Sequence, residues 1–278
     1  MKNAPKSPIE EGNWIQLEER AVFRLTGPDR VRYLNGQVSN DVALDLEANA
    51  IAACVCTLKG KVEALVWISS DGDSLIIDGE LGQREELFAR LDRYLIADDC
   101  ELHDITGELT LIHHFNQNAP GIPSRRSLTA GKDLWIPPSR SHSLSEKKQL
   151  SPETFQFSQL LAKIPKANCE ITANEFPAEL GLDTWAVNFH KGCYLGQEVI
   201  SRIESVGRVK RALILATTDQ SLPQGTNVIT EANANRATGI TTRASQPSCA
   251  GKELTLTLIK YLSLDSEPME PIEIQISN

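Results

Sequence analysis

Residues 191–198, with the sequence KGCYLGQE, combine side chains and backbone that could do chemistry. Cys193 precedes a predicted helix that starts near Gly196. The partial positive charge of that helix N-terminus and the ammonium of Lys191 would both favour the thiolate, the reactive and metal-binding form. Gly192 and Gly196 would let a ligand approach the backbone closely. The alternative is a buried cysteine in a tight turn, with Lys191 as a solvated surface residue.

The segments on either side must position this thiol. Residues 185–189 form an apolar run that predicts a strand leading into the turn. Val199, Ile200 and Ile203 have the spacing of the inner face of the following helix. His190 is nearby, but adjacency in sequence does not place its ring against the thiol, so it predicts no Cys–His pair.

The remaining cysteines do not suggest a metal site. No pair of Cys-x-x-Cys spacings occurs, so no zinc site is expected and the thiols are expected to be reduced. Cys54 and Cys56 alternate along an apolar run, so they would share one face of a strand as small core residues. The other three are Cys100, Cys169 and Cys249.

Composition narrows the class of protein. The chain has 278 residues, of which 41% are hydrophobic and 23% charged, values typical of a globular protein. The formal net charge of -9 argues against a broad nucleic-acid or anionic-membrane surface. No apolar run approaches the ~18 residues of a membrane span, and residues 1–12 resemble neither a secretory signal nor a transit peptide. We therefore expect a cytoplasmic protein without membrane or direct nucleic-acid partners.

The predicted elements indicate an α+β fold with antiparallel sheet. Helices are expected after Gly27, over residues 83–96 and from Ser151 to about Lys163. Residues 117–151 are expected to be loop with one short strand near 134–136. After Gly207 only strands are expected, which suggests a small β-barrel or sandwich. The predicted strands cover residues 20–26, 51–57, 61–69, 74–78, 101–105, 109–113, 209–216, 227–230, 237–242 and 254–262.

Residues 191–198 match the Lys-Gly-Cys-Tyr-x-Gly-Gln-Glu signature of the YgfZ family, relatives of the glycine-cleavage T protein. Mitochondrial iron–sulfur assembly factors share this signature. The resemblance extends, in the expected order, over most of residues 20–212. It includes LTGPDR at 25–30, LNGQVSND at 34–41, TLKGK at 57–61, FPAELGLD at 176–183, Arg202 and GRVKR at 207–211.

This resemblance implies a GcvT-like ring of α+β domains around a central hole, followed by a small C-terminal β-barrel. The corresponding domains are residues 1–116, 117–205 and 206–278. It also implies tetrahydrofolate or a derivative in the hole, and iron–sulfur client or assembly proteins as partners. The functional residue would be Cys193, within a motif that includes Lys191, Gly192, Tyr194, Gly196, Gln197 and Glu198. The cofactor-binding residues would be Asn40, Asp41, Thr57, Lys59, Lys61, Glu179, Trp185 and Arg202.

Each of those cofactor-binding residues also has a structural interpretation. Asn40 and Asp41 could cap a helix, and Lys59 and Lys61 could be ordinary hairpin-turn residues. Glu179 could cap a turn. Trp185 could be a core residue, and Arg202 could cover a surface.

Two segments depart from the family pattern. Residues 159–165, QLLAKIP, stand where the family commonly has an Arg-Ile-Glu-x-Gly-Ile-Pro-like stretch. The catalytic aspartate motif of the T protein is not recognisable around residues 71–92.

Three functional hypotheses remain: a folate-dependent accessory factor for iron–sulfur enzymes, an aminomethyltransferase or other one-carbon enzyme, and a non-catalytic interaction module. The motif cysteine favours the first, because aminomethyl transfer needs no thiol.

Overall fold

The structure is a computed structural model. It describes residues 7–17, 20–44, 46, 48–143, 148–207, 209–232, 235–243, 246–247, 253–260 and 272–276. Cys249 and Arg208 lie outside the described residues.

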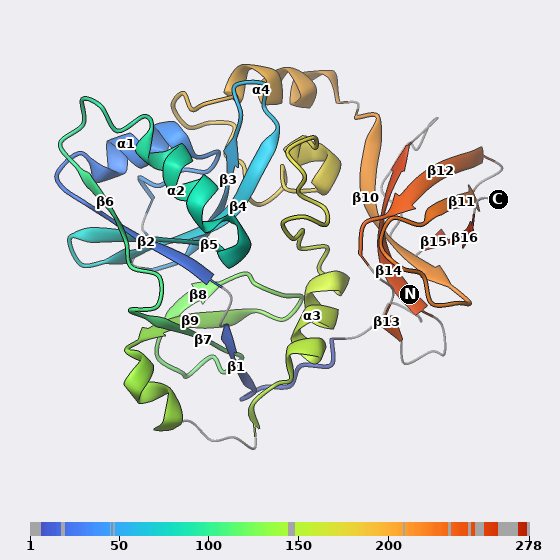
Figure 1. Cartoon of the computed structure of the whole chain (residues 1–278), viewed down its shortest axis with the longest axis horizontal. Helices are drawn as coiled ribbons and strands as arrows, with labels where there is room; N and C mark the ends of the chain where they lie inside the picture. The colour runs from blue at the N-terminus through green and yellow to red at the C-terminus, as the bar shows by residue number, and fades with distance from the viewer. Residues whose placement is uncertain are drawn as a thin grey trace.

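A five-stranded antiparallel sheet, ordered β3-β4-β5-β2-β6, forms the first layer of the molecule (Figure 1). Two helices pack on one of its faces, α1 (Arg30–Gln37) and α2 (Arg84–Asp92), the latter preceded by the short η1 (Leu81–Gln83). The predicted strand and helix positions are confirmed here, although α2 ends before the expected residue 96. The strands are β2 (Arg20–Thr26), β3 (Ile51–Cys56), β4 (Val62–Asp71), β5 (Ser74–Glu80) and β6 (Glu101–Asp104).

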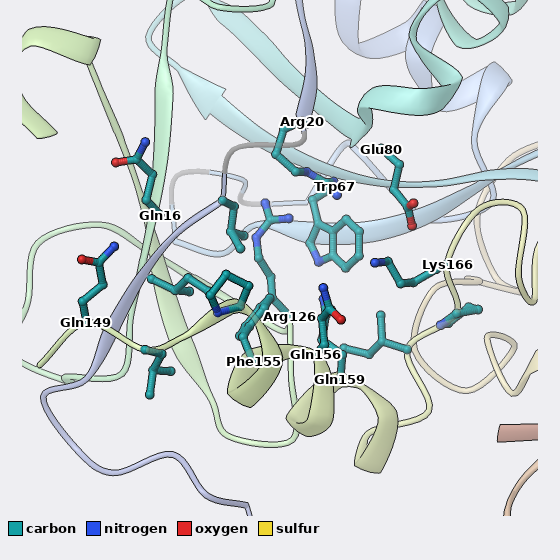
Figure 2. Close-up of a pocket in the computed structure, with 16 residues that line it drawn as sticks. Gln16, Arg20, Trp67, Glu80, Arg126, Gln149, Phe155, Gln156, Gln159 and Lys166 are labelled. Carbon is teal, nitrogen blue, oxygen red and sulfur yellow. The ribbon is translucent and has the colours of Figure 1, made fainter. Parts of the chain in front are cut away.

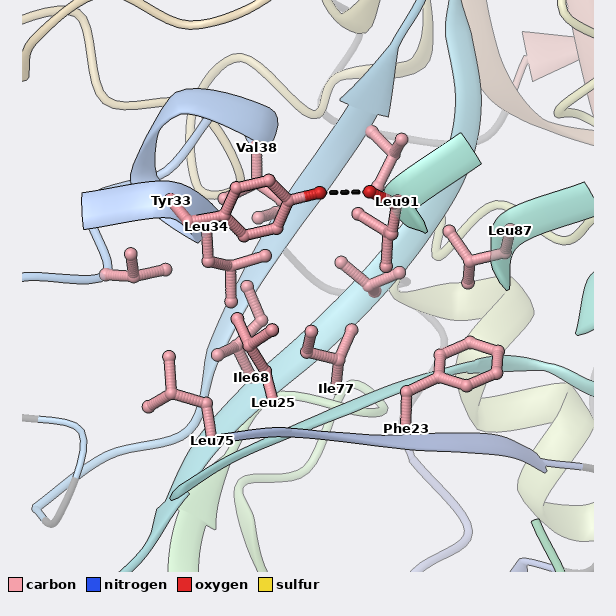
Figure 3. Close-up of a cluster of buried hydrophobic side chains, with 14 of the residues drawn as sticks. Phe23, Leu25, Tyr33, Leu34, Val38, Ile68, Leu75, Ile77, Leu87 and Leu91 are labelled. Atoms are coloured by element: carbon pink, nitrogen blue, oxygen red, sulfur yellow. Dashed lines mark hydrogen bonds between the residues drawn. The ribbon is translucent and has the colours of Figure 1, made fainter. Parts of the chain in front are cut away.

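Both faces of this sheet are buried, which explains the nearly continuous apolar runs of β3 and β4. Ala53 and Val55 join the cluster under α1 and α2, where the hydroxyl of Tyr33 donates to the carbonyl of Leu91 (Figure 3). Cys54 and Cys56 point to the opposite face, into a cluster built with residues 160–200. Their prediction as core residues on one strand face is confirmed.

A second sheet, ordered β1-β7-β9-β8, lies beside the first (Figure 1). Helix α3 (Pro152–Leu161) follows it, and the Ser151 hydroxyl caps this helix by accepting from the amide of Thr154. The expectation of one short strand in residues 117–151 was wrong, since two strands form there. Sheet membership also crosses residue 116, because β7 pairs with β1 on one side and with the later strand β9 on the other. The strands are β1 (Trp14–Leu17), β7 (Thr110–His114), β8 (Ile122–Ser124) and β9 (Gly131–Ile136), followed by η2 (Pro138–Ser143).

Residues 162–196 connect the layers with little regular structure apart from η4 (Pro177–Leu180), and helix α4 (Gln197–Val206) follows. The strand predicted over residues 185–189 does not form. Its apolar side chains instead fill the core behind β3 and β4 from an irregular segment. The apolar run at residues 185–189 therefore predicted burial correctly, but it did not predict the secondary structure.

The C-terminal strands form one sheet, ordered β15-β10-β14-β12-β11-β16, with β13 paired to β14. The predicted all-strand character is confirmed for the described residues. The two end strands of the path are not paired with each other, so a closed barrel is not confirmed in the described part of the chain. The strands are β10 (Arg211–Thr218), β11 (Asn227–Ala232), β12 (Asn235–Thr241), β13 (Gln246–Pro247), β14 (Glu253–Lys260), β15 (Ile272–Glu273) and β16 (Gln275–Ile276).

Among the helices that the structure describes, none has the length and apolar character needed to cross a membrane.

Candidate functional site

Cys193 is exposed on the turn that leads into α4, whereas Lys191 and Tyr194 beside it are buried. The Lys191 side chain turns inward, and its ammonium lies 5.1 Å from the centre of the Tyr194 ring. The alternative of a buried cysteine beside a solvated lysine is therefore wrong in both parts. The turn presents the thiol and anchors the residues around it.

Lys191 fastens this turn to the end of α1. Its Nζ donates to three backbone carbonyls, those of Asn35 at 2.6 Å, Val38 at 2.8 Å and Asn40 at 2.8 Å. Burial lowers the pKa of Lys191 to about 8, although the charge of Asp41 acts in the opposite direction. Two of the family-like segments, residues 34–41 and 191–198, are therefore in contact, and the Lys191 ammonium joins them.

A backbone contact between two glycines fixes the other end of the turn. Gly196 has a φ of 87°, and a Cβ there would lie 2.5 Å from the Thr57 carbonyl oxygen and 3.1 Å from the Gly60 Cα. Gly60, in the β3–β4 hairpin, has a φ of 71°. Only glycine fits such a close approach at these angles without strain. This contact seats the start of α4 on the hairpin.

Tyr194 closes the turn from inside. Its ring is part of the core that contains Cys54 and Cys56, and its hydroxyl is buried with no hydrogen-bond partner in the described structure. Burial raises the pKa of Tyr194, and the nearby thiols add to this effect. A hydrogen bond with Cys54, followed by burial, raises the pKa of the Cys56 thiol. Both thiols are buried in this core, and the raised pKa keeps Cys56 protonated.

A cavity of about 310 Å³ lies elsewhere, between the two sheets and α3 (Figure 2). Trp67 of β4, Glu80 at the end of β5, and Gln156 and Gln159 of α3 line it together with Lys166. An aromatic surface with a few polar groups in a volume above about 300 Å³ is typical of small-molecule sites. The segment that departs from the family pattern thus contributes directly to this lining. Neither Cys193 nor any predicted cofactor-binding residue belongs to it.

Beneath this cavity lies a buried charge network that sequence reasoning missed. Arg126, 2% exposed, donates to Asp78 of β5 at 2.8 and 3.1 Å and to Asp133 of β9 at 2.8 Å. Arg20 also pairs with Asp78, at 2.7 Å, and both guanidiniums lie about 5 Å from the Trp67 ring centre. The network joins the first sheet to the second. A lone carboxylate in the apolar run SLIID was the signal available in the sequence.

The acid–base properties of this network follow from its charges. Burial opposes ionisation of Asp133, but the charge of Arg126 and a 2.7 Å hydrogen bond with His113 outweigh it, so the pKa of Asp133 lies well below its usual range. Asp133 and Asp78 likewise raise the pKa of Arg126 against the effect of burial. Both arginines of the cavity wall are therefore neutralised by carboxylates.

Comparison with known proteins places this geometry in context. No family model matches the chain. It is 24% identical over 228 residues to the mitochondrial "Iron-sulfur cluster assembly factor IBA57 homolog" of Neurospora crassa, covering 72% of this chain and 52% of the relative. It is 28% identical over 244 residues to the "tRNA-modifying protein YgfZ" of Cronobacter sakazakii, covering 76% and 73%. The chain spans about half the length of its fungal relatives.

Among solved structures, glycine cleavage system aminomethyltransferase T from Bartonella henselae has a similar fold. The TM-score is 0.75 at 13% identity, over 91% of this chain and 79% of the other. These findings support a YgfZ/GcvT-like family. The resemblance seen in the sequence is thereby confirmed, together with a mixed α/β fold similar to that of aminomethyltransferase T.

Several of the predicted cofactor-binding residues have partners within the fold. The Asn40 amide donates to the Ala52 carbonyl at 2.8 Å, and the Asp41 carboxylate accepts from the Ala43 amide at 2.9 Å. The Thr57 hydroxyl accepts the amides of the hairpin turn, from Lys59 at 3.2 Å and from Lys61 at 3.1 Å. These contacts shape the α1 end and the hairpin.

Glu179 and Lys61 also have partners within the fold. Arg211 of β10 donates to both oxygens of Glu179 at 3.0 Å, which ties η4 to the C-terminal sheet. The Lys61 ammonium donates to the Asn174 carbonyl at 2.7 Å and lies over the Phe176 ring. Burial lowers the pKa of Lys61, although the Glu179 charge acts in the opposite direction.

The remaining predicted residues lie at the surface or at the edge of the core. Trp185 packs against the core behind β3 and β4, with the Arg125 guanidinium 4.6 Å from its ring centre. On α4, Arg202 and Glu198 form an exposed ion pair at 3.1 Å, while Gln197 is half-buried. In the described parts of the chain, no group of three or more His, Cys, Asp and Glu side chains is arranged to hold a metal ion.

Proposed function

We propose that this chain is a tetrahydrofolate-binding accessory protein that supports the maturation or repair of iron–sulfur enzymes, including enzymes that modify tRNA. The observation that carries the proposal is an exposed Cys193 between the buried Lys191 and Tyr194. Anchoring both neighbours orders a turn whose exposed side chain is a thiol. Such a turn suits contact with another protein or its cluster.

The names of the relatives support the iron–sulfur part of the proposal, and the cavity supports the folate part. Its residues suit a pterin in chemical type, because Trp67 offers an aromatic wall and Glu80, Gln156 and Gln159 offer hydrogen bonds. The chain's own groups would bind and orient the cofactor, and bound folate would supply one-carbon chemistry. The predicted hairpin and α4 cations, Lys59 and Arg202, would attract an anionic glutamate tail.

The proposal includes finer features of the architecture. The three sheets would surround a central hole as a ring. The domain boundaries would lie near residues 116 and 205, with strands β1 and β7 of the first domain completing the sheet of the second. The C-terminal sheet would close as a barrel, because one residue, Ile274, separates its two end strands. A cytoplasmic location is part of the same proposal.

Complementation and binding test this function together. In a strain that lacks the protein, the wild-type chain should restore the activity of an iron–sulfur tRNA-modifying enzyme, and Cys193→Ala should not. Calorimetry should detect tetrahydrofolate binding to both proteins, because Cys193 is outside the cavity lining. Absence of binding together with full restoration by Cys193→Ala would make the proposal wrong. Glycine-cleavage activity with lipoyl carrier protein would instead favour an aminomethyltransferase.

A further inference from the structure

Two charged side chains in the cavity are left without an opposite charge. Arg20 and Arg126 are compensated by Asp78 and Asp133. Lys166 and Glu80 form no ion pair with each other or with another residue in the part of the chain that the structure describes. Both are half-buried residues of the lining, so their charged groups are available to a ligand in the cavity.

The two groups are held close to the same wall of the cavity. Glu80 Oε1 accepts a 3.0 Å hydrogen bond from the amide of Ala167, so the residue after Lys166 fixes the carboxylate. In the view of Figure 2, the Lys166 ammonium and the Glu80 carboxylate lie on the same side of the Trp67 indole. One donor group, one acceptor group and an aromatic ring therefore line one part of the cavity wall.

We propose that Glu80 and Lys166 recognise the edge of a fused 2-amino-4-oxopyrimidine, such as the pterin of a folate. This inference rests on the proposed function and deepens it. The edge offers two adjacent donors, the 2-amino group and the ring N–H, which a carboxylate accepts. Beside them it offers a 4-oxo acceptor, to which an ammonium donates. Glu179, predicted as a cofactor-binding residue, pairs with Arg211.

A pair of ligands that differ only at this edge tests the assignment. Folic acid carries the 4-oxo group, and aminopterin carries an amino group in its place. Titrations monitored by calorimetry should show that Lys166→Met weakens folic acid binding by about tenfold and leaves aminopterin unchanged. Glu80→Gln should weaken folic acid binding by about tenfold, while its amide oxygen can still accept from Ala167. Aminopterin should be weakened less, because its ring nitrogen at this edge carries no hydrogen for the carboxylate to accept. Lys163→Met, outside the lining, removes the same charge as a control and should change neither affinity.

Guanosine, which has the same edge, separates this inference from the folate proposal. Equal folic acid binding by the wild type and both variants, each with an unchanged melting temperature, would overturn the edge assignment and leave folate binding intact. If guanosine binds with the predicted dependence on both residues and folic acid does not bind, the edge assignment holds and the folate proposal fails. If neither ligand binds the wild-type chain, both are wrong.

Discussion

The Cys193 turn and the cavity between the two sheets and α3 differ in how their buried cations are compensated. In the turn, the Lys191 ammonium is satisfied by three neutral carbonyls, and the exposed thiol has no part in that arrangement. In the cavity wall, Arg126 is satisfied by two carboxylates, while Lys166 and Glu80 remain uncompensated within the described chain. Lys191 and Arg126, whose hydrogen-bonding groups are paired within the fold, therefore stabilise the structure. The groups left over, one thiol and one charged pair, are candidates for contact with other molecules.

The largest effect on stability is expected at the buried charges beneath the cavity. Asp133→Asn removes one of the two carboxylates that neutralise Arg126, so it should lower the free energy of unfolding by about 3–5 kcal/mol at neutral pH. Chemical denaturation would measure this loss. The matched control is Glu198→Gln, which breaks an exposed ion pair on α4 and should cost no more than about 0.5 kcal/mol. Equal effects of the two substitutions would mean that burial does not set the value of these charges.

The ion pair between Asp133 and Arg126 also makes the stability of the protein depend on pH, with a definite sign. The folded-state pKa of Asp133 lies below the ordinary aspartate value of about 3.9. The folded state therefore binds fewer protons than the unfolded state as the carboxyl titrates. Its stabilisation is fully present above that ordinary value and is lost as the pH falls through the folded-state pKa. The stability difference between wild type and Asp133→Asn should accordingly shrink below about pH 4.

The next largest effect is expected at the cation of the turn. Lys191→Met keeps much of the aliphatic stem but leaves three carbonyls without their donor, so we expect a loss of about 2–3 kcal/mol in unfolding free energy. Lys59→Met, at an exposed position of the hairpin, is the control and should be close to neutral. Amide exchange would add a local measurement, with faster exchange expected around residues 35–42. No change in exchange there would contradict the anchoring role of Lys191.

A smaller effect should come from the glycine contact at the start of α4. Gly196→Ala places a Cβ 2.5 Å from the Thr57 carbonyl at a φ of 87°, so it should cost about 1–3 kcal/mol. Gly192→Ala is the matched control in the same motif, because nothing lies within 4 Å of its added Cβ. Thermal melting of the two variants should therefore separate a packing glycine from a freely substitutable one. Similar melting temperatures would count against the close approach of α4 to the hairpin.

The two regions also differ in how far sequence could predict them. The Cys193 motif is contiguous, so the turn and the following helix could be predicted from neighbouring residues. The role of its glycines could not: Gly196 packs against the hairpin, whereas a Cβ at Gly192 would have nothing within 4 Å. The partners of Lys191 lie some 150 positions away, which made a solvated lysine an equally reasonable interpretation. Trp67, Glu80 and Lys166 come from three separate segments, and only the folded sheets bring them to one cavity. No local spacing could have predicted that site.

The smallest effect on stability is expected at the Cys193 thiol, where a functional role can be tested separately from a structural one. Cys193 is exposed and outside the hydrogen-bonded frame of the turn, so Cys193→Ser should change the unfolding free energy by less than about 0.5 kcal/mol. Under the proposed function, the same substitution should still abolish complementation, because serine does not reproduce thiolate chemistry. Measuring both quantities on one variant matters, since a loss of complementation with a large loss of stability would only report misfolding. A stable variant that complements fully would remove Cys193 from the function and leave the cavity as the site to pursue.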